Sequence, residues 1–218
     1  MRRLISGVAA TGVLVSAALL AGCDDDDDGV RAQDADSDFG RCVDRAGQPL
    51  DGADDWSVAE EREFLGRPEV LSCVLTDVPA EDREDLVDRA FPDDSGTDDA
   101  ADEARTAKTD ALVAYVAERS DASRDGLVDD VAALMDAFDW DETDPWVGAR
   151  KQVALAIVRA EGDAEEYDAW LADTGRTDDA EGRIDFVQEQ EAEGTPLADE
   201  VRALADRIES AQDDVDDD

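Results

Sequence analysis

Residues 139–146 combine four carboxylates with two tryptophans. The acidic residues are Asp139, Asp141, Glu142 and Asp144, and the aromatic residues are Trp140 and Trp146. Carboxylate oxygens bind hard cations, and an indole ring offers an apolar face on which a sugar ring can stack. One interpretation is therefore a patch that holds a cation or a glycan. The other is an acidic loop between two helices, whose tryptophans anchor the core.

The chain of 218 residues contains no histidine. This excludes Ser-His-Asp and Cys-His catalysis and any histidine ligand to a metal or a haem. It does not exclude enzymes that work with two carboxylates, such as glycosidases that hydrolyse cell-wall glycan. Because the chain has 61 Asp and Glu residues, such pairs arise by chance, and the sequence singles out no catalytic residue.

Residues 121–132 resemble the calcium-binding loop of EF-hand proteins, with Gly126 at the sixth position. The resemblance implies oxygen ligands from Asp121, Ser123, Asp125 and Asp129. Ala132 stands where that family has a bidentate glutamate, and Arg124 adds a positive charge, so calcium binding should be weak. The alternative is a turn between two helices in which Ser120 or Ser123 caps the second helix.

The formal net charge is −41, from 61 acidic and 20 basic residues. This charge argues strongly against binding to a nucleic acid backbone, because the protein would repel the phosphates that it must neutralise. The same repulsion acts within the folded chain at low salt, so salt or divalent cations should stabilise the fold. The acidic surface should also avoid anionic lipid headgroups.

The first 22 residues have the pattern of a secretory signal. Arg2 and Arg3 form a positive start, and Leu4 to Leu20 is a run of apolar and small residues. The run is too short and its side chains are too small for a convincing membrane span. We therefore expect the remaining chain to lie outside the cytoplasm.

The run ends in Leu20-Ala21-Gly22-Cys23, which resembles the lipobox of bacterial lipoproteins. The resemblance implies cleavage before Cys23 and a diacylglyceryl group on its sulfur, and two acyl chains hold a protein stably on a membrane. Two arginines leave with the signal, so the mature chain of 196 residues would carry −43. Asp24 follows the lipidated position, which in that family means the outer face of the plasma membrane.

The other cysteines, Cys42 and Cys73, form an even pair in an oxidising compartment, which predicts a disulfide. The alternative is two buried thiols. A zinc site is disfavoured, because two cysteines without histidine leave the ligand set short.

Helical signals dominate from Trp56 onward. Ser57 to Glu60 reads as a capping box, and apolar residues recur with helical spacing. The clearest stripes are Leu127, Val131, Leu134 and Phe138, and Leu197, Val201, Leu204 and Ile208. No segment alternates like a strand pair. The sequence thus predicts an all-α domain, a compact bundle or orthogonal array of about seven or eight short helices, over residues 55–212. An acidic flexible tether (residues 23–54) would precede it, and a disordered acidic tail (213–218) would follow.

These observations favour a lipid-anchored, extracytoplasmic helical protein with a non-enzymatic binding or structural role at the cell envelope. Its expected partners are the membrane, through Cys23, and an envelope protein or glycan. Two alternatives stay open: a weak Ca²⁺-binding protein that uses residues 121–129, and a carboxylate-dependent cell-wall hydrolase. No other cofactor is expected.

Overall fold

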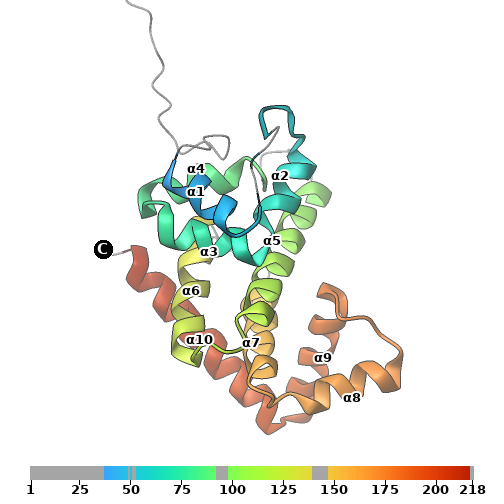
Figure 1. The fold of residues 1–218 in the computed structure, drawn as a ribbon. Coiled ribbons are helices and arrows are strands. Elements are labelled where there is room, and N and C mark those ends of the chain that lie inside the picture. The colour runs from blue at the N-terminus through green and yellow to red at the C-terminus, as the bar shows by residue number, and fades with distance from the viewer. Residues whose placement is uncertain (1–36, 49, 51–52, 92–97, 139–146, 217–218) are drawn as a thin grey trace, which may run out of the picture.

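The computed structural model describes residues 37–48, 50, 53–91, 98–138 and 147–216. Every regular element in these ranges is helical, which confirms the predicted all-α fold (Figure 1). The first five α-helices are α1 (Asp38–Arg45), α2 (Val58–Leu65), α3 (Pro68–Asp77), α4 (Ala80–Asp88) and α5 (Asp98–Glu118). The other five are α6 (Arg124–Ala137), α7 (Val147–Ala160), α8 (Glu165–Thr174), α9 (Ala180–Glu193) and α10 (Pro196–Asp216). One 3₁₀ turn, η1 (Ala53–Asp55), precedes α2.

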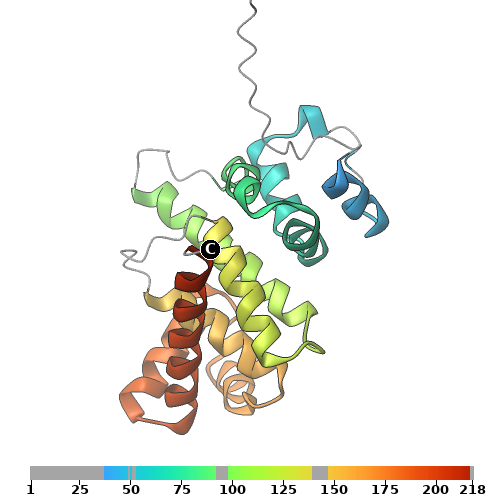
Figure 2. The ribbon, with the colours of Figure 1, turned by 90° about the vertical axis from the view of Figure 1, so that its left-hand side faces the viewer.

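The short helices α1 to α4 pack together over one end of the longer ones (Figures 1 and 2). Helix α3 is the centre of this group, because it contacts α1, α2, α5 and α6. It begins with Pro68 at its first position, where the missing N–H costs nothing. Its neighbour α2 begins with the predicted capping box, in which Ser57 and Glu60 satisfy each other's backbone N–H groups.

Helix α1 lies within residues 23–54, which the sequence analysis predicted to be a flexible tether, so that prediction is wrong for this segment. Residues Asp38–Arg45 form a helix capped by Ser37, and its side chains Phe39 and Val43 are completely buried. Few apolar residues occur in this segment, but these two lie one turn apart on one face, and that is enough to dock the helix on α3. The ten helices therefore exceed the seven or eight expected from the sequence.

The longer helices α5, α6, α7 and α10 form the body of the molecule. Helix α10 packs along both α6 and α7, and α5 packs along α7 (Figures 1 and 2). Both predicted apolar stripes face this core, with Leu134 and Ile208 completely buried. Helix α7 is the most enclosed, since every residue from Gln152 to Val158 is buried.

The C-terminal boundary also differs from the prediction. Helix α10 continues to Asp216, beyond the predicted start of the tail at residue 213. Just before that boundary, the buried side chain of Gln212 joins α10 to α7, because its amide oxygen accepts a hydrogen bond of 3.0 Å from Arg150.

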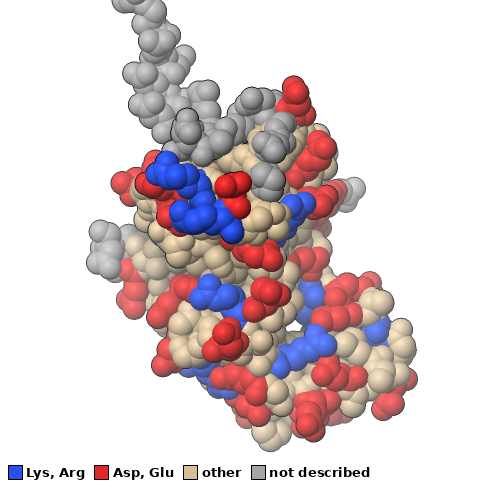
Figure 3. Space-filling view, viewed as in Figure 1, with Lys and Arg blue, Asp and Glu red and all other residues tan. Residues whose placement is uncertain are grey.

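Acidic side chains dominate the visible surface, and basic ones lie scattered among them (Figure 3). Val58 is the one large hydrophobic side chain that stands exposed among the described residues. None of the described helices combines the length and the apolar composition needed to cross a membrane.

Candidate functional site

A pocket of about 570 Å³ lies between α5, α7 and the segment that leads into α9. Figure 3 shows a hollow on this side of the protein, with acidic and basic side chains around it. Eleven residues line the pocket: Asp110, Val113, Ala114, Ala117, Ser120, Ala156, Arg159, Ala160, Asp178, Asp179 and Arg183. Its volume lies within the usual range for small-molecule sites, which is about 300–1,000 Å³.

Small side chains on two helices create the space. On α5, Ala114 and Ala117 stand on nearly the same face of the helix, and on α7, Ala156 and Ala160 are spaced by one turn. The two helices pack along each other, and these alanines form the apolar part of the pocket wall. Larger residues at the same positions would fill the gap.

Arg183 of α9 forms the charged floor of the pocket, and its side chain is only 4% exposed. Its Nε donates to the Gln152 amide oxygen at 3.0 Å, and one terminal nitrogen donates to the Asp178 carboxylate at 3.2 Å. The other terminal nitrogen is paired with Asp110 of α5. A buried guanidinium is stable only when it is paired in this way, so Arg183 is held by three elements and is fully occupied.

Asp178 is the most heavily bonded carboxylate of the pocket. It accepts a hydrogen bond of 2.9 Å from the Tyr167 hydroxyl, and it is paired with both Arg159 and Arg183. Burial alone would raise the pKa of Asp178, but the hydrogen bonds from Tyr167, Arg159 and Arg183 hold that pKa below its usual range. The carboxylate therefore stays ionised, and it is not a proton donor at neutral pH.

Arg159 of α7 also lines the pocket. Its guanidinium lies 5.4 Å from the centre of the Tyr167 ring and forms a second ion pair of 2.8 Å with Asp168. Burial and the hydrogen bond to Asp178 raise the pKa of the Tyr167 hydroxyl, so the phenol stays neutral. Three carboxylates (Asp110, Asp178, Asp179) and two guanidinium groups line the pocket, which leaves a negative balance.

The rim of the pocket is fixed by the start of α9. Asp179 caps this helix by accepting a 2.8 Å hydrogen bond from the Gly182 backbone N–H, and it also accepts one from the Thr177 hydroxyl. These hydrogen bonds lower the pKa of Asp179. Gly182 is required here, because a Cβ at that position would lie 2.3 Å from the Thr177 carbonyl oxygen.

Gln152 leaves one buried polar atom without a partner. Its side chain is completely buried on α7, and its Oε1 accepts from Arg183, but its Nε2 has no hydrogen bond among the described residues. An unpaired buried amide donor costs free energy. The amide is nevertheless oriented by Arg183, since only its oxygen can accept that bond.

The predicted calcium ligands do not converge. Helix α6 begins at Arg124, so Asp125 and Asp129 stand on a helix instead of in a loop, and Ser123 caps that helix by accepting from the Gly126 N–H at 3.1 Å. Asp125 is paired with Arg207 at 2.5 Å. The carboxylates of Asp121, Asp125 and Asp129 form no group of ligands within 4.8 Å of one another. The alternative interpretation of a capping Ser123 is thus the observed one.

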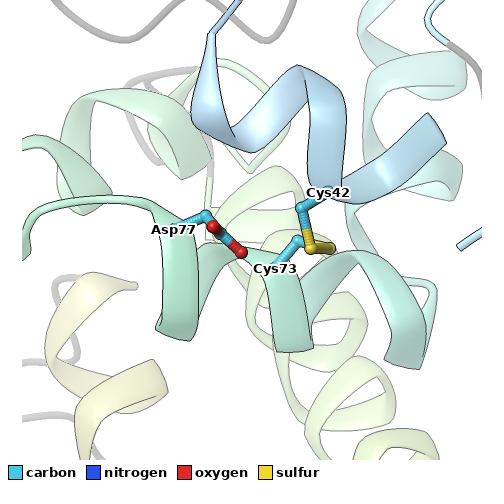
Figure 4. A group of neighbouring side chains, drawn as sticks. All are labelled: Cys42, Cys73 and Asp77. Atoms are coloured by element: carbon cyan, nitrogen blue, oxygen red, sulfur yellow. A yellow bond between two sulfur atoms is a disulfide. The ribbon is translucent and has the colours of Figure 1, made fainter. Parts of the chain in front are cut away.

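The one tight group of thiol and carboxylate side chains among the described residues consists of Cys42, Cys73 and Asp77 (Figure 4). Cys42 and Cys73 form a disulfide that joins α1 to α3, with their Cα atoms 5.7 Å apart. The predicted bridge is therefore confirmed, and its sulfurs are not available as metal ligands. Cys23 and residues 139–146 lie outside the described residues.

The pKa values of the Glu60, Asp178 and Asp179 carboxyl groups are lowered. Hydrogen bonds from Ser57 cause the shift in Glu60. A glycosidase needs the opposite arrangement, a carboxyl group whose pKa is raised so that it can protonate the leaving group. These three carboxylates suit structural and binding roles.

The pocket was not found from the sequence. Alanines spaced along α5 and α7 and an arginine on a largely polar helix were the available signals, but each is common in helices that line no pocket. Comparisons with protein family models, with curated proteins and with solved structures found no match to this chain.

Proposed function

We propose that this protein is a lipid-anchored, extracytoplasmic binding module of the cell envelope, and that its ligand occupies the pocket between α5, α7 and α9. It has a binding role and no catalytic one. The pocket is the observation that carries this proposal, because it combines about 570 Å³ of space with a rigidly held charged floor.

The anchoring part of the proposal rests on the sequence. The positive start at Arg2 and Arg3, the apolar run and the lipobox-like Leu20 to Cys23 all favour export and lipidation. The disulfide between Cys42 and Cys73 supports the same location, because such bridges persist in oxidising compartments.

The geometry of the pocket favours binding over hydrolysis. Asp178 and Asp179 are tied to hydrogen-bond donors that keep them ionised. Arg183 is occupied on all sides by Gln152, Asp178 and Asp110. Groups held so firmly are preorganised, and preorganisation lowers the free-energy cost of binding a ligand.

Retention of a ligand tests the binding role. The full-length chain would be extracted gently from membranes of cells that make it and examined by native mass spectrometry. We expect a noncovalently bound small molecule that is lost in Ala114→Leu, where the larger side chain fills the pocket, and kept in Ala203→Leu. Ala203 is exposed on α10, away from the pocket, and is a matched control. Equal occupancy of the two variants would overturn the proposed site.

The anchor is tested separately with Cys23→Ala. We expect this variant to leave the membrane fraction, whereas Cys42→Ser should remain there because it keeps the lipidation site. If Cys23→Ala remained in the membrane fraction after a carbonate wash, the lipid anchor would be refuted.

A further inference from the structure

We infer that the pocket between α5, α7 and α9 binds an organic ammonium ion with an apolar body. This inference rests on the proposed function and adds the chemical class of the ligand. Its first basis is the distribution of hydrogen-bonding capacity among the three carboxylates that line the pocket.

Asp110 is the carboxylate with capacity left for a ligand. Both oxygens of Asp178 accept hydrogen bonds. Oδ1 accepts from Tyr167 and Arg183, and Oδ2 accepts from Arg159. Both oxygens of Asp179 are engaged as well, by Gly182 and Thr177. Asp110 is paired with Arg183 through Oδ1, its side chain is 49% exposed, and its Oδ2 accepts no hydrogen bond from any described residue.

The charge balance of the pocket selects a cation. An anionic ligand would have to displace a carboxylate from one of the two guanidinium groups, because Arg183 is paired with Asp110 and Asp178 and Arg159 with Asp168 and Asp178. That would leave a carboxylate without its partner beside a second negative group. An ammonium group instead adds to the existing pairs, because it donates to Asp110 without breaking the bond to Arg183. The strongly negative chain, with a net charge of −41, also attracts cations from a distance.

The apolar walls account for the rest of the ligand. The apolar part of the lining comes from Val113, Ala114 and Ala117 of α5 and from Ala156 and Ala160 of α7. These side chains offer no charge and no side-chain hydrogen bond, so they match a hydrocarbon body. The hydroxyl of Ser120, at the end of this wall, is the one uncharged polar side chain in the lining.

Three probes of similar size and different charge separate the effect of the ligand's charge from that of its shape. They are hexylammonium, 1-hexanol and hexanoate at pH 7. Each would be titrated into the purified full-length chain by isothermal titration calorimetry, and a titration into detergent alone would be subtracted. We expect hexylammonium to bind at least about tenfold more tightly than the other two, since a charge-assisted hydrogen bond distinguishes it.

Two variants locate the binding. Asp110→Asn removes the charge and should weaken hexylammonium about tenfold or more. Ala114→Leu keeps every charge but places a larger side chain in the pocket, and it should abolish binding of all three probes. Ala203→Leu should bind like the parent chain. Melting temperatures of the variants report whether each is folded, and Ala114→Leu tests the inference even if Asp110→Asn is unstable.

The outcomes separate this inference from the proposed function. If hexanol or hexanoate bound as tightly as hexylammonium, the cationic assignment would be wrong and the pocket would still be a binding site. If no probe bound, but native mass spectrometry showed a retained molecule that Ala114→Leu loses, the ammonium class of ligand would be refuted. The proposed binding role of the pocket would stand. If no probe bound and no molecule were retained, both proposals would fail.

Discussion

The Tyr167 hydroxyl donates a 2.9 Å hydrogen bond to the Asp178 carboxylate, and Arg159 covers the Tyr167 ring while it pairs with that carboxylate. The same arrangement occurs a second time in the fold. Tyr115 donates a 2.7 Å hydrogen bond to Asp130, and Arg119 lies 5.4 Å from the centre of the Tyr115 ring and 3.4 Å from Asp130. One of these clusters lies beside the pocket and the other joins α5 to α6.

The two clusters contain both tyrosines of the chain, which makes their ionisation directly visible. Burial and the neighbouring aspartate raise the pKa of each phenol above its ordinary value near 10. We therefore expect no tyrosinate absorbance at 295 nm as the folded chain is taken through pH 10, whereas the chain in urea should titrate there. The contribution to stability is present below pH 10 and is lost as the pH rises through the higher pKa of the folded state. A tyrosinate signal near pH 10 without unfolding would contradict one cluster if its amplitude corresponded to one tyrosine, and both clusters if it corresponded to two.

Asp178→Asn tests the cluster of Tyr167, Asp178 and Arg159 through the stability of the fold between pH 7 and pH 3. Because the pKa of Asp178 is lowered in the folded state, its ionisation stabilises the fold above about pH 4, and this contribution disappears as the pH falls through the folded pKa. At pH 7 we expect the variant to lose about 1.5–3 kcal/mol of unfolding free energy, the range for hydrogen bonds to a charged group. Urea unfolding from pH 7 to pH 3 measures this, and the difference between variant and parent should shrink towards pH 3. A constant difference would show that the charge is irrelevant.

A pair of glycine substitutions tests the rim of the pocket. In Gly182→Ala the new Cβ would lie 2.3 Å from the Thr177 carbonyl oxygen, so the segment before α9 must shift, and we expect a loss of about 1–3 kcal/mol. Gly148→Ala is the control, because its Cβ would meet Ile184 at an ordinary 3.6 Å. There we expect no loss or a gain of up to about 1 kcal/mol, since alanine has the higher helix propensity. Thermal unfolding distinguishes the two, and equal effects would count against a fixed rim.

Local features of the fold could be predicted from the sequence because short-range physics determines them. The capping box at Ser57 and the stripe from Leu127 to Phe138 depend only on neighbours within a few residues, and each was found where it was expected. Helix α1 was missed because its burial depends on just Phe39 and Val43, too few for a periodic signal.

The pocket could not be predicted in the same way. Asp110 and Arg183 are 73 residues apart in the sequence, and periodicity does not say which helix faces which. Spacing alone also left two interpretations open for residues 121–129, because the oxygen pattern of a calcium loop and the cap of a helix occur in the same segment. The helix cap at Ser123 and the ion pair between Asp125 and Arg207 explain why the segment is helical there.

The disulfide should contribute a large part of the stability of the helices α1 to α4. It closes a loop between residues 31 positions apart, which corresponds to about 3–4 kcal/mol in the chain-entropy model. We expect reduction to lower the melting temperature by about 10 °C for a chain of this size. Cys42→Ser should behave like the reduced parent and should not respond to reductant. Two alkylatable thiols in the unreduced, denatured chain after removal of Cys23 would contradict the bridge.

The response to calcium distinguishes a specific site from screening of the negative surface. Asp121, Asp125 and Asp129 form no common ligand group, so the triple substitution of these residues to asparagine should not change the effect of calcium. Screening acts on all charges, so added NaCl should raise the melting temperature of a chain with a net charge of −41. The measurement is thermal unfolding of parent and triple variant in a few millimolar CaCl₂ and in NaCl at matched ionic strength. A calcium-specific rise that the triple variant loses would restore the calcium-binding interpretation of residues 121–132. A calcium effect of equal size in both chains would assign it to the acidic surface as a whole.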